Sequence, residues 1–276
     1  FLGCIIMLCR VAFAPFRRAA LKRLERMIKP LVAGNWKMHG NTETASHLAA
    51  QLVAQWSDRP VAERSVEMVL FPPSVHLSLV KGAVAGSGIA VGAQNLSQHG
   101  SGAYTGEISG DMLVDQGCDY VLVGHSERRD LFGESSATVA EKFKAAQSSG
   151  LIPILCVGET LRQRQQEQTV AVVTAQIKAV IDCVGLHNVC RAVVAYEPVW
   201  AIGTGETASP EQAQQVHRAI RNQLGEVGLS TRLLYGGSVK ASNAAELFGQ
   251  PDINGGLVGG ASLEAIEFFN IVKRAE

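Results

Sequence analysis

The stretch VVAYEPVWAIGTGETASPEQAQQVHRAIRNQLG, residues 193–225, holds one complete strand, loop and helix. Its short apolar run ends at Tyr196 and predicts a buried strand. Ser209 can then cap a helix, Pro210 suits the first helical position and Gln212 completes a capping box, while the final glycine of the stretch stops the helix. A strand followed by an amphipathic helix is the repeating unit of a parallel sheet.

The same unit recurs along the chain from residue 31 onward. Two predicted helices carry an apolar stripe that would cover a sheet, one of Ala213, Val216, Ile220 and Leu224 and one of Val173, Ile177, Val180, Ile181 and Val184. We expect Gly185 to end the second helix in a left-handed cap. Candidate strands end near Trp36, Phe71, Ala93, Val123, Val157, Tyr196, Tyr235 and Val258. Eight such units predict an α/β fold, a single closed (β/α)8 barrel.

A doubly wound open sheet is the structural alternative, because it also alternates strands and helices. Its usual nucleotide-binding fingerprint is missing. Gly203-Thr204-Gly205 comes nearest, but it does not continue as GxGxxG and no strand directly precedes it. The barrel therefore remains the preferred architecture.

Residues 1–26 differ from the rest of the chain in charge. They hold six Arg or Lys residues and one Glu, a net charge of +5, which leaves −5 for residues 27–276. That larger part carries no nucleic-acid footprint. We expect residues 1–26 to be a vector-derived or start-site extension, disordered or at most a loosely packed helix, and residues 27–276 to form the catalytic barrel.

Membrane and disulfide signals are both weak. The apolar residues 1–9 are too few to span a bilayer, and no basic stretch precedes them as in a signal peptide. The six cysteines form no CxxC pair and fit no zinc or disulfide spacing. We therefore expect no membrane association and free thiols, as in the reducing cytoplasm.

Unusual polar residues follow three predicted strands, where barrels of this type place their active sites. Asn35 and Lys37 lie at the end of the first strand, His125 at the end of the fourth and Glu197 at the end of the sixth. Alone, each has an ordinary explanation as a surface charge or a core histidine. Together they predict a base, a neutral electrophile and a cation that face one cavity.

Several strings of sequence closely resemble the triosephosphate isomerase family, and the resemblance runs from residue 27 to the end of the chain. It implies a cofactor-free and metal-free enzyme of glycolysis and gluconeogenesis, located in the cytoplasm. Such an enzyme interconverts dihydroxyacetone phosphate and D-glyceraldehyde 3-phosphate through an enediolate. The matching strings are Ala33-Gly34-Asn35-Trp36-Lys37, Gly102-Ala103-Tyr104-Thr105-Gly106-Glu107, Ala195-Tyr196-Glu197-Pro198-Val199-Trp200-Ala201-Ile202-Gly203-Thr204-Gly205, Tyr235-Gly236-Gly237-Ser238 and Leu257-Val258-Gly259-Gly260-Ala261-Ser262.

The resemblance also implies the roles of the catalytic residues. Glu197 is similar to the family's base and His125 to its neutral electrophile. Lys37 supplies a fixed positive charge, and Asn35 a neighbouring amide donor. Moving a carbon-bound proton requires such a base, and the oxygen that becomes negative requires such donors.

Substrate phosphate is expected to bind glycine-rich turns after the last two strands. Gly259 and Gly260 precede a short helix, whose backbone N–H groups favour an anion. Ser238 and Gly203 would complete this cradle.

Supporting residues follow from the same resemblance. Glu127 is similar to the carboxylate beside the catalytic lysine, and Ser126 to the residue that holds the base in the open state. Residues 198–208 resemble a closing lid with Trp200 as its bulky body, and Tyr235 is expected to contact that lid.

Residues 94–106 resemble the family's interdigitating loop, whose tip, Thr105, enters the partner's active site and makes a homodimer. Two other functions stay open. Another phosphate-binding barrel, such as a sugar-phosphate epimerase, would require metal ligands or two opposed acids. A surface-binding scaffold role would use residues 1–26.

Overall fold

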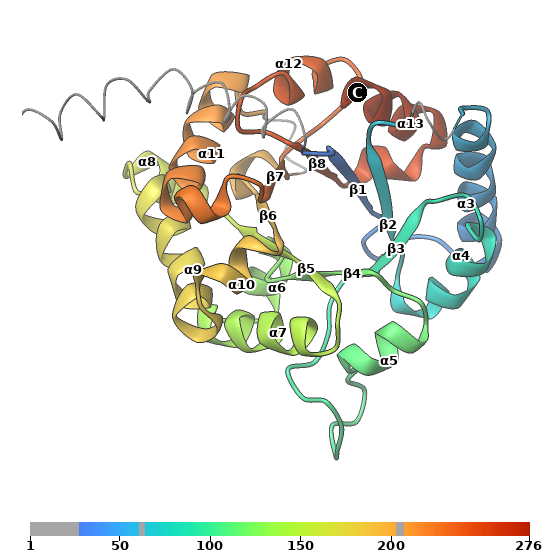
Figure 1. Cartoon of the computed structure of the whole chain (residues 1–276), viewed down its shortest axis with the longest axis horizontal. Coiled ribbons are helices and arrows are strands. Elements are labelled where there is room, and N and C mark those ends of the chain that lie inside the picture. The colour runs from blue at the N-terminus through green and yellow to red at the C-terminus, as the bar shows by residue number, and fades with distance from the viewer. Residues whose placement is uncertain (1–27, 61–63, 203–206) are drawn as a thin grey trace, which may run out of the picture.

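The computed structural model describes residues 28–60, 64–202 and 207–276 (Figure 1). Eight strands form a closed barrel in which each strand pairs in parallel with the next, and the first strand pairs with the last. The strands are β1 (Leu31–Asn35), β2 (Glu67–Phe71), β3 (Ala90–Ala93), β4 (Tyr120–Val123), β5 (Ile152–Val157), β6 (Val193–Tyr196), β7 (Arg232–Tyr235) and β8 (Gly255–Val258). The predicted (β/α)8 barrel is confirmed.

Helices surround the barrel on the outside, as Figure 1 shows in a view close to the barrel axis. The α-helices of the described residues are α3 (Thr42–Ser57), α4 (Leu77–Ala83), α5 (Gly110–Asp115), α6 (Ser126–Leu131), α7 (Ser136–Ser148), α8 (Leu161–Gln165), α9 (Thr169–Val184), α10 (Leu186–Cys190), α11 (Pro210–Leu224), α12 (Ala244–Phe248) and α13 (Ala265–Arg274). Short 3-10 helices are η2 (Ser74–His76), η3 (Val199–Ala201), η4 (Glu226–Gly228) and η5 (Gly260–Leu263).

The strand ends lie where the apolar runs predicted them, with one small difference. Strand β1 ends at Asn35 rather than Trp36, although the Trp36 backbone amide still donates to the carbonyl oxygen of Phe71 at 3.0 Å. Asn35 and Lys37 still lie at the carboxyl end of β1 despite this one-residue difference.

The predicted signals of helix α11 are confirmed. Ser209 and Gln212 form the capping box, Pro210 occupies the first turn, and the predicted stripe is buried. At Gly185, after α9, the prediction was only partly right. Its φ of 84° is positive, but its ψ of 151° lies outside the left-handed helical region, because the chain turns directly into α10.

Two apolar cores lie on the two sides of the sheet. Alternate residues of each strand point inward or outward, so that Val32 packs against the helices while its neighbours fill the barrel. The interior side chains are Leu31, Ala33, Val69, Phe71, Tyr120, Leu122, Ile154, Cys156, Val193, Ala195, Leu234 and Leu257. The barrel is therefore a packed core rather than a channel.

A polar triad closes the amino-terminal end of the barrel. The hydroxyl of Tyr120 donates to Glu67 at 2.6 Å, and Arg232 donates to Glu67 at 2.5 Å and to the Tyr120 hydroxyl at 2.8 Å. These residues begin β2, β4 and β7, so the triad ties three strands at the end opposite to the predicted site.

Predictions for residues 1–26 and for Gly203 fall on residues outside the described ranges. Within those ranges no helix is long and apolar enough to cross a membrane. The cysteines that the structure describes, at positions 118, 156, 183 and 190, are free thiols. Burial raises the pKa of the Cys118 thiol to about 11 and that of Cys156 well above its ordinary value, so both stay protonated at neutral pH.

Candidate active site

Glu197 follows β6 directly and is almost fully buried, at 1% exposure. Its backbone amide donates to the carbonyl oxygen of Val157 at 2.7 Å, and its carboxylate Oε2 accepts from the backbone amide of Ser126 at 2.8 Å. The other oxygen, Oε1, completes no hydrogen bond to any described residue. This oxygen faces Nε2 of His125 at 3.2 Å, and it can accept a proton from a bound molecule.

The backbone around Glu197 leaves no room for side chains on the neighbouring strand ends. A Cβ atom at Gly158 would lie 1.8 Å from the carbonyl oxygen of Glu197, and one at Gly236 would lie 2.8 Å from its Cγ. Glycine at both positions lets β5 and β7 approach β6 closely enough to enclose the carboxylate.

His125 caps the amino terminus of α6, just after β4. The backbone amide of Glu127 donates to its Nδ1 at 3.3 Å, so Nδ1 carries no proton in this arrangement. The other ring nitrogen, Nε2, lies 3.2 Å from Oε1 of Glu197. The imidazole therefore presents Nε2 to the same space as this carboxylate oxygen.

Lys37 has a backbone φ of 51°, which is uncommon for a residue with a side chain. Its amide donates to the Asn35 side chain at 3.0 Å, and Gln94 donates to its carbonyl oxygen at 2.8 Å. Its ammonium donates to Glu127 at 2.5 Å. These bonds hold a strained backbone in place, a pattern typical of functional sites.

The hydrogen bond from Lys37 lowers the pKa of the Glu127 carboxylate. Burial alone would raise the pKa of Glu127, but the hydrogen bond from Lys37 and the nearby positive charge lower it below its ordinary value of 4.5. The Glu127 carboxylate is therefore charged at neutral pH.

A cavity of about 230 Å³ joins the predicted residues. It is lined by Asn35, Lys37, His125 and Glu197 on one side and by the predicted phosphate residues Ser238, Gly259 and Gly260 on the other, together with Ile202, Gly236, Gly237, Val239, Lys240, Leu257 and Ala261. The predicted catalytic residues and the glycine turns, which come from the ends of β1, β4, β6, β7 and β8, thus border one space at the carboxyl ends of the strands.

A second buried carboxylate, Glu159, was missed by the sequence reasoning. One of its oxygens accepts from the Tyr196 hydroxyl at 3.1 Å and from the Trp200 indole at 3.0 Å, and Arg164 lies 3.5 Å away and stacks on the Trp200 ring. The Tyr235 hydroxyl is also buried beside this region, against Gly237. Glu159 follows β5 closely, a position that could have marked it.

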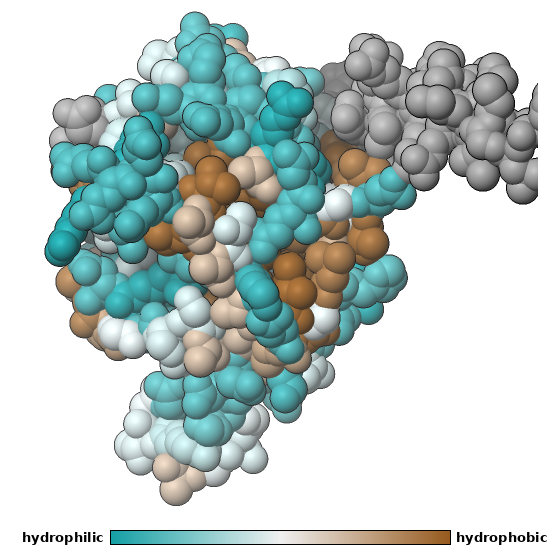
Figure 2. Space-filling model, turned by 90° about the vertical axis from the view of Figure 1, so that its left-hand side faces the viewer, coloured by the Kyte–Doolittle hydropathy of each residue, from teal (hydrophilic) through white to brown (hydrophobic). Residues whose placement is uncertain are grey.

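Thr105 lies exposed on the loop between β3 and α5, which projects away from the barrel at the bottom of Figure 1. Figure 2 shows the same loop as a mostly hydrophilic lobe. Within it, the rings of His99 and Tyr104 stack with their centroids 4.0 Å apart. The loop base is fixed by Lys142, which is buried and donates to Asn95 at 2.8 Å and to Glu134 at 2.7 Å.

A cavity of about 420 Å³ borders the candidate site and shares Asn35, Lys37 and His125 with it. Its rim carries the exposed apolar side chain of Phe132, and Met38, exposed at 93%, also lines it. Such exposed apolar side chains beside a polar site mark a surface that another protein segment could cover.

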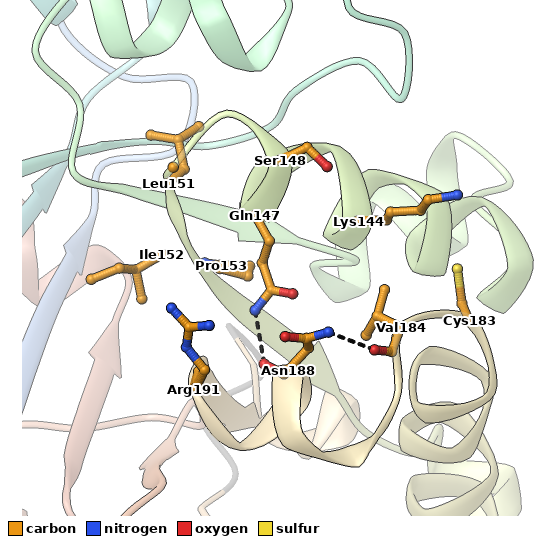
Figure 3. Close-up of a pocket in the computed structure, with 11 residues that line it drawn as sticks. Lys144, Gln147, Ser148, Leu151, Ile152, Pro153, Cys183, Val184, Asn188 and Arg191 are labelled. Atoms are coloured by element: carbon orange, nitrogen blue, oxygen red, sulfur yellow. Dashed lines mark hydrogen bonds between the residues drawn. The ribbon is translucent and has the colours of Figure 1, made fainter.

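Another cavity of similar volume lies at the opposite end of the barrel (Figure 3). It is lined by α7, the start of β5 and the ends of α9 and α10, and Arg191 and Asn188 lie at its edge. None of the predicted site residues lines it. Among the residues that the structure describes, no group of three or more His, Cys, Asp or Glu side chains could hold a metal ion.

Comparison with known sequences places these observations in a family. A model of the triosephosphate isomerase family matches residues 30–275. This chain belongs to the triosephosphate isomerase family. Two triosephosphate isomerases, from Thiobacillus denitrificans and Pseudomonas entomophila, are 55% and 53% identical to it, and each alignment covers 90% of this chain and 99% of the relative.

A third triosephosphate isomerase, from Dechloromonas aromatica, is 52% identical over 90% of this chain and 100% of its own length. The relatives are thus similar over the whole barrel rather than over a single motif. The predicted family is confirmed, and the family is one of enzymes.

Proposed function

We propose that this chain interconverts dihydroxyacetone phosphate and D-glyceraldehyde 3-phosphate through an enediolate, with Glu197 as base and neutral His125 as electrophile. The observation that carries the proposal is the shared cavity, in which Oε1 of Glu197 and Nε2 of His125 lie 3.2 Å apart. One group can take a proton from carbon while the other donates to oxygen.

Glu197 and His125 together account for every proton transfer of the reaction. Glu197 removes a proton from the hydroxymethyl carbon of dihydroxyacetone phosphate and returns it to the former carbonyl carbon. His125 donates from Nε2 to the oxygen that becomes negative and moves a proton between the two oxygens. Lys37 adds a positive charge to the same cavity, and Asn35 lies beside it. The protein itself thus supplies each proton transfer.

The phosphate group is expected to lie against Gly259 and Gly260, at the start of η5, with Ser238 and Gly203 completing the cradle. A Cβ atom at Gly260 would meet no protein atom within 4 Å, so its backbone borders open space. Backbone N–H groups at a helix start favour an anion, and a missing side chain lets it approach.

Residues 198–208 act as a lid in this proposal, and their described ends support it. The Trp200 indole is anchored to Glu159 at the first end, and the backbone amide of Ala208 faces the Tyr235 hydroxyl at the other. Ser126 holds the base while the site is open. Exclusion of water would keep the enediolate from losing its phosphate.

The active form is proposed to be a cytoplasmic homodimer. The loop that carries Thr105 projects from the barrel, and a cavity with apolar side chains at its rim lies beside the site. The loop of one subunit could therefore fill the cavity of the other. Free thiols are consistent with a reducing compartment. Residues 27–276 are proposed to form the catalytic domain.

A coupled assay for glyceraldehyde 3-phosphate conversion in metal-free buffer tests the proposal. Fast turnover that persists with a chelator and is lost in Glu197→Gln supports both the reaction and the base. Activity that a chelator abolishes would instead favour a metal-dependent epimerase. A folded but inactive wild type would contradict the isomerase function.

A further inference from the structure

His217 is a buried titratable residue that the proposed chemistry does not use. It lies on α11, is fully buried, and does not line the catalytic cavity. Its Nδ1 lies 2.8 Å from the carbonyl oxygen of Ala213, and because a carbonyl can only accept, Nδ1 carries the proton. Burial lowers the pKa of His217 to about 4, so the ring is neutral at neutral pH.

The imidazole ring packs against two tyrosines at once. It meets Tyr196 edge to face, with centroids 5.7 Å apart and planes at 84°, and lies 6.4 Å from the ring of Tyr235. The two tyrosine rings are 6.5 Å from each other. The three rings form one contiguous cluster behind the ends of β6 and β7.

Each tyrosine directly precedes a part of the candidate site. Tyr196 is followed by the proposed base, Glu197, and Tyr235 is followed by the turn that leads to Ser238. The two strand ends are joined, because the backbone amide of Gly236 donates to the carbonyl oxygen of Tyr196 at 2.7 Å. A shift of either ring would therefore move both strand ends.

The cluster also reaches the carboxylate that anchors Trp200. The hydroxyl of Tyr196 donates to Glu159 at 3.1 Å, and the same oxygen of Glu159 accepts from Trp200 at 3.0 Å. A displaced Tyr196 ring would thus loosen this anchor as well as the backbone of the base.

We propose that His217 is a positioning residue that fixes the base Glu197 relative to the phosphate turn at Ser238, through Tyr196 and Tyr235. The role rests on the proposed isomerase function. It uses the flat ring of the imidazole, which fills the space between the tyrosines, while the bond to Ala213 satisfies the buried Nδ1 proton. It acts without touching the substrate.

The test compares His217→Gln, which keeps a donor but loses the ring, with His217→Phe, which keeps a ring of similar size. Trp56→Phe is the matched control. Trp56 is a buried aromatic residue on α3 that packs on Phe269, away from the three-ring cluster. Turnover number, KM and melting temperature are measured for all three and for the wild type.

We expect His217→Gln to lower kcat by about tenfold or more while KM changes little, because misplacement of a catalytic group acts mainly in the transition state. His217→Phe should restore most of kcat. Trp56→Phe should lower the melting temperature and leave kcat unchanged. Unchanged kcat in His217→Gln, or equal kcat loss in the Gln and Phe variants, overturns the proposal.

A second measurement does not depend on turnover. The imidazole NMR signals of His125 report the geometry around Glu197, and they should shift in His217→Gln but not in Trp56→Phe. Unshifted signals overturn the positioning role even if the wild type proves inactive. An inactive wild type with shifted signals would contradict the proposed function alone.

Discussion

The backbone amide of Ser126 donates to the carboxylate of Glu197 at 2.8 Å and so fixes one oxygen of the proposed base, while the other faces Nε2 of His125 at 3.2 Å. Glu197→Asp keeps the charge but withdraws the carboxylate by one methylene. We expect kcat to fall by roughly a hundredfold with little change in KM, since a displacement of about 1 Å can cost that much. Steady-state kinetics check this, with Glu67→Asp at the far end of the barrel as the control. Normal turnover in Glu197→Asp would refute the base assignment.

Lys37→Met removes the ammonium that faces the cavity and keeps an unbranched side chain at a position with φ of 51°. A hydrogen bond to a charged group contributes about 1.5–3 kcal/mol, so kcat/KM should fall by roughly 10- to 150-fold. Lys240→Met is the matched control, because Lys240 lines the same cavity and is exposed. Equal losses in the two variants would show that any positive charge near the cavity suffices.

Inorganic phosphate or vanadate at millimolar concentration should raise the melting temperature of the wild type. A ligand at a hundred times its Kd stabilises the folded state by about 2.7 kcal/mol. Gly260→Ala should fold normally, because its Cβ meets no protein atom within 4 Å, but should shrink the shift by blocking close approach of the anion. Gly82→Ala on α4 has equally open space and should keep the full shift. A full shift in Gly260→Ala would place the bound anion elsewhere.

The pH dependence of stability should carry a contribution from His217. Its pKa is about 4 in the folded protein and near 6.5 when unfolded, so the unfolded chain binds the proton first as the pH falls. The stabilisation is complete above pH 6.5 and is lost between pH 6.5 and pH 4. It amounts to roughly 3 kcal/mol.

Urea unfolding of the wild type and of His217→Phe between pH 7.5 and pH 4.5 checks this window. The difference in unfolding free energy between the two should change across it, because only the wild type takes up that proton on unfolding. His187→Gln replaces an exposed histidine and should follow the wild type. Parallel curves for His217→Phe and the wild type would contradict the expectation.

The triad at the amino-terminal end of the barrel should affect stability and not catalysis. Arg232→Met leaves Glu67 and the Tyr120 hydroxyl without their shared donor, which costs about 1–3 kcal/mol. Calorimetry should show a lower melting temperature, and kcat should stay at the wild-type value. A large loss of kcat would mean that the two ends of the barrel are coupled.

Much of the fold could be predicted from the sequence, because parallel strands buried on both faces appear as short apolar runs. Strand β1 ends at Asn35, one residue before the predicted end at Trp36. The Trp36 amide still donates to β2, but the pairing of β1 with β8 stops at Gly34. At Gly185 the glycine predicted a positive φ correctly. Its ψ depends on the helix that follows, which propensity does not specify.

The candidate site was less evenly predictable. Asn35, Lys37, His125 and Glu197 could be proposed because all four lie at or just past the ends of strands, and a barrel brings strand ends together. Glu159 received no role, although it follows β5 closely, because its partners come from other units of the barrel. Contacts of this kind have no local sequence signal, since they exist only after the sheet closes.

The pairing of β1 with β8 has a consequence for the order of events during synthesis. Leu31 is made long before its partner in the barrel, Gly255. At roughly 5–20 residues per second, one side of the first strand stays without its neighbour for on the order of tens of seconds. A newly made chain therefore carries an open strand edge that could pair with other chains, and the pairing of β1 with β8 removes it.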